Sequence, residues 1–223
     1  MKIYIVRHGQ TEMNLKHVLQ GNSDSPLTEK GIAGAYKIQE AFAQMDFACI
    51  ITSTLQRAIK TAEIIKGDRD IPIIKDPHVG EMAFGHWQGR TQEEISTTAE
   101  IGQNYINYFK HPQHYIPTEG AESFDSVLKR AGDFLDKMKE FSQENKNGNV
   151  LLVSHGAFIK AILSVAKELP LEHFWEEPYI TNCSISIIEI NQDGLQVLEE
   201  GDTAHLGEHK VKMSVSGYLR ERE

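Results

Sequence analysis

The sequence has little cysteine and no long hydrophobic run. The only two cysteines among its 223 residues, Cys49 and Cys183, lie in apolar stretches (FACIITS and CSISIIEI), so we expect reduced core side chains and not a disulfide or a catalytic pair. No apolar run approaches the roughly 18–20 residues that a membrane helix needs. The N-terminal MKIYIV has one lysine and a short strand-like run, which does not resemble a signal peptide. We therefore expect a cytoplasmic protein that does not contact membranes.

Positive charge is also scarce. Lysine and arginine number 23 against 32 aspartates and glutamates, which gives a formal net charge of −9. This balance argues against a nucleic-acid partner, because no basic stripe is present to neutralise a phosphate backbone. An acidic protein binds a small anion only where its few positive groups are concentrated in one pocket. The position of each arginine is therefore informative.

Short apolar runs alternate with helical patterns along most of the chain. Six runs are typical of strands: residues 2–6, 47–52, 71–75, 149–153, 184–190 and 195–200. The first four are largely uninterrupted, as expected for strands buried on both faces of a parallel sheet. A turn signal from Asn191 to Gly194 separates the last two and predicts a hairpin at the sheet edge.

The helical patterns lie between these runs. We expect helices at residues 28–45 (with Thr28 as N-cap), 54–66, 123–142 and 156–168, and a helix start at the capping box of Thr91 and Glu94. The clearest pattern is at 123–142, where apolar residues recur at helical spacing along one face that we expect to pack on the core: Phe124, Val127, Leu128, Ala131, Leu135, Met138 and Phe141.

The alternation predicts an α/β fold, a three-layer α-β-α sandwich around a mostly parallel sheet of about six strands. No linker, repeat or low-complexity tract divides the chain, so we expect a single domain over residues 1–223. Residues 86–121 contain no strand pattern and predict a small helical cap insertion that lies over the sheet. Residues 207–223 are mostly polar and charged and are expected to form a frayed tail.

Chemically active side chains follow four of the predicted strands. The first strand ends in Arg7-His8-Gly9, the second leads to Arg57, the third to Glu81, and the fourth to Ser154-His155-Gly156. None of these residues alone indicates an active site, since a single histidine at a strand end more often has a structural role. The carboxyl ends of parallel strands meet at one sheet edge, however, and there the groups would share a pocket. Glycine after each histidine permits tight turns and close approach of a ligand.

Two arginines, two histidines and a glutamate suit phosphoryl transfer better than metal binding. Guanidinium groups repel a cation but grip a phosphoryl group in bidentate fashion. A neutral imidazole, whose ordinary pKa is about 6.5, is a competent nucleophile near neutral pH. A carboxylate beside it can protonate the leaving oxygen and then deprotonate the attacking water. The residues alone therefore predict a phosphate site with a histidine nucleophile.

Motifs in this order resemble the histidine phosphatase superfamily, in its phosphoglycerate mutase-like branch. The resemblance extends over essentially the whole chain: Arg7-His8-Gly9-Gln10-Thr11 with Asn14, Arg57-Ala58 with Thr61-Ala62, Glu81 with Phe84-Gly85 and Trp87-Gln88-Gly89, Ser154-His155-Gly156, and Asp202-Thr203-Ala204-His205-Leu206.

The resemblance implies a role for each matching residue. It makes His8 the nucleophile that becomes phosphohistidine and Glu81 the general acid and base. The phosphate-binding residues that it implies around them are Arg7, Asn14, Gln20, Gly21, Arg57, His155 and Gly156. Glu122-Ser123 match the end of a familial Gly-Glu-Ser stretch, but Ala121 replaces the glycine and leaves their role open. Neither a metal nor an organic cofactor is implied.

The same pocket serves phosphatases and mutases. Mutases of this family usually carry Glu-Arg-His-Tyr-Gly at the acid/base segment, whereas this chain has EMAFGHWQG from Glu81, which resembles the phosphatase branch. We expect a phosphomonoesterase for a small phosphorylated metabolite, acting as a monomer or homodimer. The alternatives are a 2,3-bisphosphoglycerate-dependent phosphoglycerate mutase and a catalytically idle member that binds phosphorylated ligands.

Substrate specificity is expected to come from the cap and from the segment around Thr181-Asn182 and His205. Cap residues that would either shape the pocket or pack within the cap are Tyr105, Tyr108, Phe109, His111, His114 and Tyr115. Lys110 is the only added positive charge between residues 91 and 115, so a second strong phosphate site is not evident there. A small monophosphate ester is favoured over a bisphosphate; alpha-ribazole phosphate, phosphoglycolate-like acids and sugar phosphates stay open.

Overall fold

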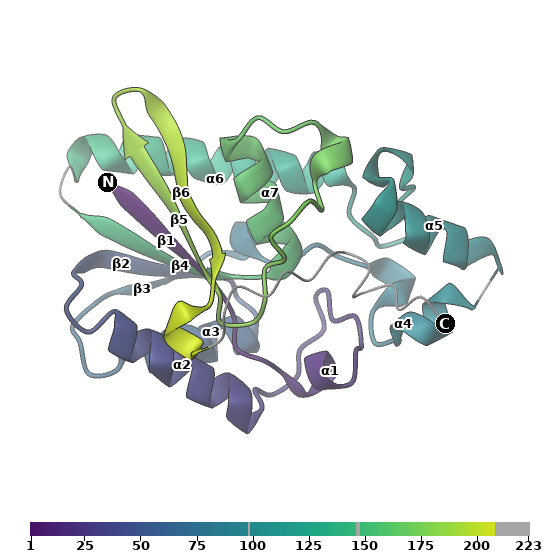
Figure 1. Cartoon of the computed structure of the whole chain (residues 1–223), viewed down its shortest axis with the longest axis horizontal. Helices are drawn as coiled ribbons and strands as arrows, with labels where there is room; N and C mark the ends of the chain where they lie inside the picture. Colours follow the sequence, from purple (N-terminus) through teal and green to yellow (C-terminus); the bar gives the residue numbers. More distant parts are fainter. Residues whose placement is uncertain (98, 146–147, 208–223) are drawn as a thin grey trace.

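The computed structural model, which describes residues 1–97, 99–145 and 148–207, is built on one six-stranded sheet (Figure 1). Its strands are β1 (Lys2–Arg7), β2 (Phe47–Thr52), β3 (Ile73–Lys75), β4 (Asn149–Ser154), β5 (Ile185–Asn191) and β6 (Gly194–Asp202), in the order β3-β2-β4-β1-β5-β6. Pairing is parallel from β3 through β2 and β4 to β1, whereas β5 is antiparallel to both of its neighbours. The mostly parallel sheet is as predicted, and so is the hairpin turn, where Asn191 pairs with Gly194.

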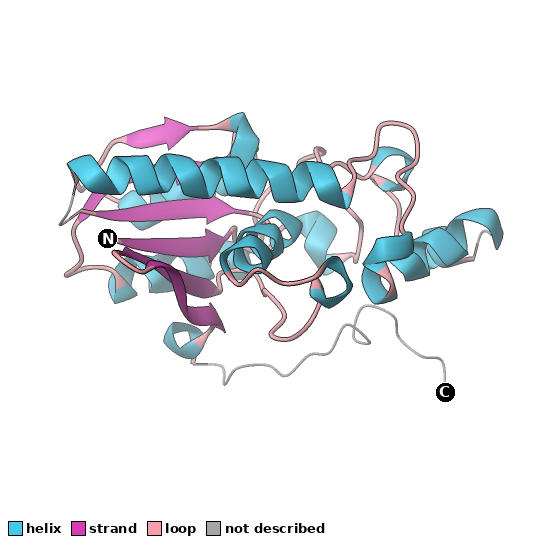
Figure 2. Ribbon diagram, turned by 90° about the horizontal axis from the view of Figure 1, so that it is seen from above, coloured by secondary structure: helices cyan, strands magenta, loops and turns pink. Residues whose placement is uncertain are grey.

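Helices cover both faces of the sheet (Figures 1 and 2). The α-helices are α1 (Glu12–Leu15), α2 (Glu29–Ala41), α3 (Gln56–Lys66), α4 (Gln92–Ser96), α5 (Ala99–Lys110), α6 (Phe124–Glu144) and α7 (Gly156–Ala166). Short 3₁₀ helices form at Pro77–Val79, Gly85–Trp87, Pro112–His114, Leu171–His173 and Ala204–Leu206. Helices α6 and α7 pack together on one face, and α2 and α3 on the other, which confirms the three-layer sandwich.

Local hydrogen bonds explain where the helices begin and end. Thr28 caps α2 through the Gly31 amide, and Thr91 forms the predicted capping box of α4. The prediction for α2 was four residues too long. The Arg69 guanidinium donates to the carbonyl of Phe42 at 3.0 Å and so satisfies a carbonyl at the helix end, where the chain turns away.

Two further expectations were wrong in detail. The third strand was expected at 71–75 and buried on both faces, but β3 begins at Ile73 and its residue Ile74 is 48% exposed. It is an edge strand, so only one side of its backbone is paired. The insertion at 86–121 contains α4 and α5 but lies beyond the carboxyl ends of the strands and not over the sheet (Figures 1 and 2).

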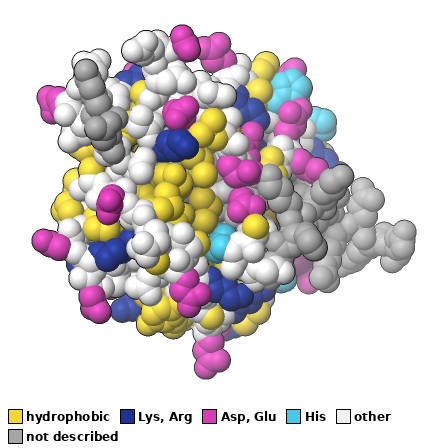
Figure 3. Space-filling view, turned by 60° about the vertical axis from the view of Figure 1, so that its left-hand side comes forward, with side chains coloured by type: hydrophobic (Ala, Val, Ile, Leu, Met, Phe, Trp, Pro, Cys, Tyr) yellow, Lys and Arg dark blue, Asp and Glu magenta, His cyan; other side chains and the backbone are white. Residues whose placement is uncertain are grey.

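The apolar residues form a cluster on each side of the sheet, and both cysteines are free and buried, as expected. On the face in Figure 3, acidic side chains stand among the basic ones around a hydrophobic patch. None of the helices in residues 1–97, 99–145 and 148–207 is long and apolar enough to cross a membrane. The expected frayed tail lies outside the described residues, apart from Gly207.

Candidate active site

The pairing of β1 with β4 brings the two histidines together. Arg7 and Ser154 are register partners at the ends of these parallel strands, so His8 and His155 follow side by side. Their ring centroids are 5.0 Å apart, with planes tilted by 56°. The two histidine side chains therefore lie next to each other at the carboxyl edge of the sheet, as the motifs at the strand ends predict.

The ring of His8 is buried and held in one orientation. Its Nδ1 lies 2.8 Å from the carbonyl oxygen of Gly9, which accepts the ring proton, so Nε2 carries the lone pair. Burial, followed by the charges of Arg57 and Arg7, lowers the pKa of His8 well below its ordinary value. The imidazole is thus neutral at neutral pH and has the form that a nucleophile requires.

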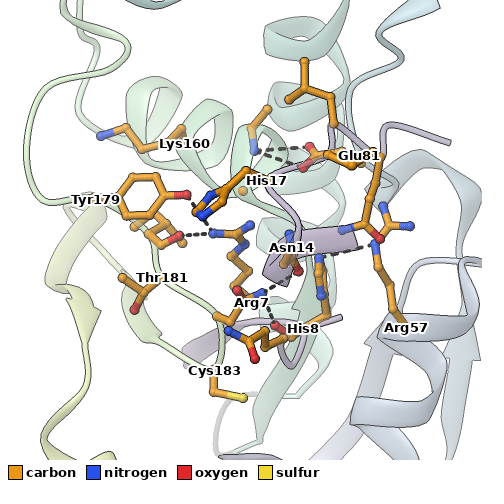
Figure 4. A pocket seen from close by; sticks show the side chains of 18 of the residues that line it. Arg7, His8, Asn14, His17, Arg57, Glu81, Lys160, Tyr179, Thr181 and Cys183 are labelled. Atoms are coloured by element: carbon orange, nitrogen blue, oxygen red, sulfur yellow. Dashed lines mark hydrogen bonds between the residues drawn. The ribbon is translucent and has the colours of Figure 1, made fainter. Parts of the chain in front are cut away.

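Arg7 is anchored by the segment that precedes β5. Its Nη1 donates to the hydroxyl of Tyr179 at 3.0 Å and to the carbonyl of Ile180 at 2.7 Å. The remainder of the guanidinium faces the pocket (Figure 4). Two acceptors on one nitrogen fix the plane of the group and leave its other donors for a ligand.

Arg57 approaches His8 from the start of α3 and is only 1% exposed. Its Nη2 donates to the Gly21 carbonyl at 2.8 Å, and Nη1 to the Ser23 carbonyl at 2.6 Å and to Asp24 Oδ1 at 3.2 Å. Burial lowers the pKa of Arg57, and the carboxylates of Glu81 and Asp24 oppose that shift. The loop that carries Gly21 thus orients the guanidinium through its backbone.

Glu81 is positioned at the N-terminus of α7. Its Oε1 accepts from the amides of Met82 at 2.9 Å and Ala157 at 3.1 Å, where helix amides have no intrahelical partner. Gly156 is the first residue of this helix and also lines the pocket. Because glycine has no side chain, a ligand there would contact the helix backbone directly. Figure 4 shows Glu81 facing the same space as the two arginines and His8.

Asn14 links the nucleophile loop to the C-terminal half of the chain. Its Oδ1 accepts from Asn182 Nδ2 at 3.2 Å, and the same Nδ2 donates to the His8 carbonyl at 3.0 Å. Gln20 lies nearby and accepts from the Ser25 hydroxyl at 3.2 Å. The side chains of Asn14, Gln20 and Asn182 all line the pocket.

These residues surround a pocket of about 490 Å³ (Figure 4). The sequence-predicted residues that line it are Arg7, His8, Asn14, Gln20, Gly21, Arg57, Glu81 and Gly156. Aromatic side chains on its cap side are Phe84, Tyr108, Phe109 and Trp175, and basic side chains around it are His17, Lys30, Lys37 and Lys160. Most of the cap aromatics pack against one another, as Tyr105 and Tyr115 do on Trp87.

His155 packs beside His8 and is not among the residues that line the pocket. Its side chain is fully buried, and Nε2 is 2.6 Å from the Ser53 hydroxyl oxygen. Burial first, and then the charge of Arg57, lowers its pKa well below the ordinary value. The structure therefore places the His155 ring beside that of the nucleophile.

The other sequence-predicted positions have different surroundings. Thr181 and Asn182 line the pocket, whereas His205 is outside its lining and its Nε2 lies 3.0 Å from the Cys183 carbonyl. Glu122 pairs with Arg130 at 2.8 Å, and Ser123 caps α6, so both have structural contacts. Among the described part of the chain, no group of three or more His, Cys, Asp and Glu side chains is arranged to hold a metal ion.

Sequence reasoning missed three supporting side chains. Ser53, Asp24 and Tyr179 orient His155, Arg57 and Arg7, respectively. Ser53 ends the apolar stretch FACIITS, and Asp24 follows the predicted phosphate-binding residues Gln20 and Gly21. Tyr179 gave no signal, because it is 172 residues from the arginine that it contacts.

Comparison with known proteins agrees with the motifs. The model of the histidine phosphatase superfamily (branch 1) matches residues 3–203. The Escherichia coli adenosylcobalamin/alpha-ribazole phosphatase is 31% identical over 86% of this chain and 91% of its own, and a probable phosphoglycerate mutase of Yersinia pestis is 32% identical over 92% and 95%. The structure of YhfR from Bacillus stearothermophilus superposes with a TM-score of 0.84 and 36% identity, covering 92% of this chain and 98% of that one. These relatives support a phosphatase or mutase activity.

Proposed function

Because the chain belongs to branch 1 of the histidine phosphatase superfamily, we propose that it is a phosphomonoester hydrolase that works through a phosphohistidine on His8. Its substrate is a small phosphorylated metabolite. The observation that carries this proposal is the environment of His8. The ring is buried and neutral, the Gly9 carbonyl accepts its Nδ1 proton, and Nε2 accepts from Arg57 Nε at 3.3 Å.

In the first step, the lone pair on His8 Nε2 attacks phosphorus and the bond from phosphorus to the ester oxygen breaks. Arg7 and Arg57 bind the equatorial oxygens and offset the charge on the transferring group, which supplies most of the rate in this chemistry. Glu81, in its acid form, gives its proton to the departing alcohol oxygen. The products of this step are the free alcohol and phosphohistidine.

In the second step, water attacks the phosphohistidine and Glu81 takes up the proton from that water. The bond between phosphorus and Nε2 breaks, its electron pair returns to the imidazole, and inorganic phosphate leaves. His8 is then neutral and Glu81 is again protonated, so the cycle is closed without a cofactor. The donors from Ala157 and Met82 keep the Glu81 carboxylate oriented between the two steps.

A phosphoglycerate mutase is the second candidate, because a relative of 32% identity bears that name. A mutase must hold a bisphosphorylated acid and return the phosphoryl group to it. Lys110 of the cap is exposed and does not line the pocket, and the cap side offers Phe84, Tyr108 and Phe109 instead. On the cap side, this apolar wall therefore offers a second phosphate no positive charge, which supports a monophosphate ester as substrate.

The test compares wild type with His8→Ala on 4-nitrophenyl phosphate, followed by mass spectrometry of alkali-quenched enzyme for phosphohistidine. We expect turnover and a phosphorylated His8 in wild type, and neither in the variant. A panel of phosphate esters, read by phosphate release, then identifies the substrate.

Three results would contradict the proposal. Equal rates for wild type and His8→Ala would remove the histidine nucleophile. Rapid conversion of 3-phosphoglycerate to 2-phosphoglycerate in the presence of 2,3-bisphosphoglycerate, without phosphate release, would establish the mutase. Binding of phosphate esters without turnover of any would favour a catalytically idle member.

A further inference from the structure

Ser53 and His155 form a buried pair whose proton arrangement can be worked out from the contacts. The Ser53 oxygen lies 2.6 Å from His155 Nε2 and accepts from the Leu55 amide at 3.2 Å. Ser53 is fully buried at the end of β2. Within the described residues His155 Nε2 is the one acceptor within reach of the Ser53 hydroxyl proton, since the other partner, the Leu55 amide, is itself a donor.

This bond fixes which ring nitrogen of His155 holds the proton. The ring is neutral, since burial and the neighbouring charges lower its pKa. A neutral imidazole has one proton, so an Nε2 that accepts from Ser53 requires an N–H at Nδ1. His155 is therefore a donor on the side away from Ser53.

That donor has nothing to donate to within the described residues. Nδ1 of His155 is buried and lacks a hydrogen-bond partner there, although the ring is 5.0 Å from that of His8. A buried donor without an acceptor is costly, and sites with such atoms are candidates for a ligand contact. The phosphoryl group brings three acceptor oxygens to His8.

We propose that Ser53 is a positioning residue that holds His155 in the Nδ1–H tautomer, so that His155 donates to the phosphoryl group on His8. The inference rests on the proposed function of His8. The opposite tautomer would turn the Nδ1 lone pair toward the phosphoryl oxygens and repel them. Ser53 thus keeps a second, neutral donor ready beside the two arginines.

The tautomer is measured directly by ¹⁵N NMR of histidine-labelled protein, with His155→Asn used to assign the signals. We expect wild-type His155 to be protonated at Nδ1, and inorganic phosphate to shift that resonance. In Ser53→Ala the preference should be lost and phosphate binding weakened. Ser53→Thr, which keeps the hydroxyl, should restore both.

Kinetics provide the second readout. Removal of a hydrogen bond to a charged group predicts a loss of about 10- to 100-fold in kcat/KM for 4-nitrophenyl phosphate in Ser53→Ala. The matched control is Ser164→Ala, which removes another buried serine hydroxyl, from α7. It should retain wild-type kinetics and the wild-type His155 signal.

A wild-type His155 protonated at Nε2 would overturn the inference, and so would an unchanged tautomer and unchanged kinetics in Ser53→Ala. If Ser53→Ala does not fold, the wild-type and Ser53→Thr spectra decide the question. The NMR readout needs no turnover. An inactive protein with the expected tautomer would therefore count against the proposed function, and an active protein with the wrong tautomer against this inference alone.

Discussion

Arg57 Nε lies 3.3 Å from His8 Nε2, the nitrogen that holds the lone pair. The opposite nitrogen, Nδ1, is occupied by the Gly9 carbonyl. The two ring nitrogens are therefore distinguished by the fold before any substrate arrives. A phosphoryl group attacked by Nε2 would arrive beside a guanidinium that is already in place, which lowers the cost of reorganisation.

The role of Glu81 predicts a dependence on the leaving group. Glu81→Gln should lower kcat/KM for glycerol 2-phosphate by about 100-fold or more, because an alkoxide needs a proton to depart. 4-Nitrophenolate leaves without one, so the first step should persist with 4-nitrophenyl phosphate. The phosphohistidine should then accumulate, since glutamine cannot deprotonate water.

Rapid-quench kinetics test this behaviour through a burst of nitrophenol about equal to the enzyme concentration. Glu63→Gln, which changes an exposed glutamate of α3, serves as the control and should show wild-type kinetics. Equal losses for the two substrates would argue that Glu81 acts only through the structure of the pocket.

The ion pair between Arg57 and Asp24 predicts a combined effect on binding and stability. Asp24 accepts from Arg57 Nη1 at 3.2 Å and from the Arg57 amide at 3.3 Å. Asp24→Asn leaves a buried guanidinium without its charged partner, and we expect a loss of about 1–3 kcal/mol in unfolding free energy. KM for phosphate esters should rise because the Arg57 side chain gains freedom.

Urea denaturation and steady-state kinetics measure the two effects. The control is Asp133→Asn on α6, whose pair with Lys129 is exposed, so its loss should change the unfolding free energy little. If Asp24→Asn behaved like this control, Asp24 would not anchor Arg57.

Tyr179 predicts an effect on catalysis without one on folding. Its hydroxyl accepts from Arg7 Nη1 at 3.0 Å, while the Ile180 carbonyl holds the same nitrogen at 2.7 Å. Tyr179→Phe removes one of two anchors, so we expect kcat/KM to fall by about 10-fold, the equivalent of one hydrogen bond. Thermal unfolding should change little.

Tyr105→Phe is the matched control. The Tyr105 hydroxyl is buried and has no partner in the part of the chain that the structure describes, so its removal should leave activity unchanged. A similar loss of activity in both variants would mean that removal of any buried tyrosine hydroxyl lowers activity, and that the bond to Arg7 is not the cause.

Local patterns predicted most of the elements, because caps and apolar periodicity act over a few residues. The edge position of β3 was not predictable in this way. The predicted segment, IPIIK at residues 71–75, is as apolar as a central strand, and strand order depends on packing between distant segments.

The same distinction between local patterns and distant contacts applies to the candidate site. His8, Arg57, Glu81 and His155 were found because each follows a strand that ends at the same sheet edge. The contacts that orient them join residues far apart in sequence, such as Ser53 to His155 over 102 positions. A single sequence contains no local signal for such a pair.

The two buried histidines predict a loss of stability in acid. Burial lowers the pKa of His8 and of His155 well below 6.5, whereas in the unfolded chain both rings titrate near the ordinary value of about 6.5. The unfolded state therefore binds more protons as the pH falls below about 6.5. The contribution of the two rings to the unfolding free energy is at its maximum above that pH. Below it, the unfolding free energy should decrease by up to about 2.7 kcal/mol per pH unit until the folded-state pKa values are reached.

Urea denaturation between pH 5 and pH 7.5 measures this slope. His205, whose pKa is also lowered by burial, acts in the same direction. Replacement of His155 by asparagine removes one titrating ring from the core and should reduce the slope by about 1.4 kcal/mol per pH unit. If wild type and variant had the same slope, His155 would be protonated in the folded chain. A histidine makes stability depend on pH in this window only when the folded state binds its proton less tightly than the unfolded state.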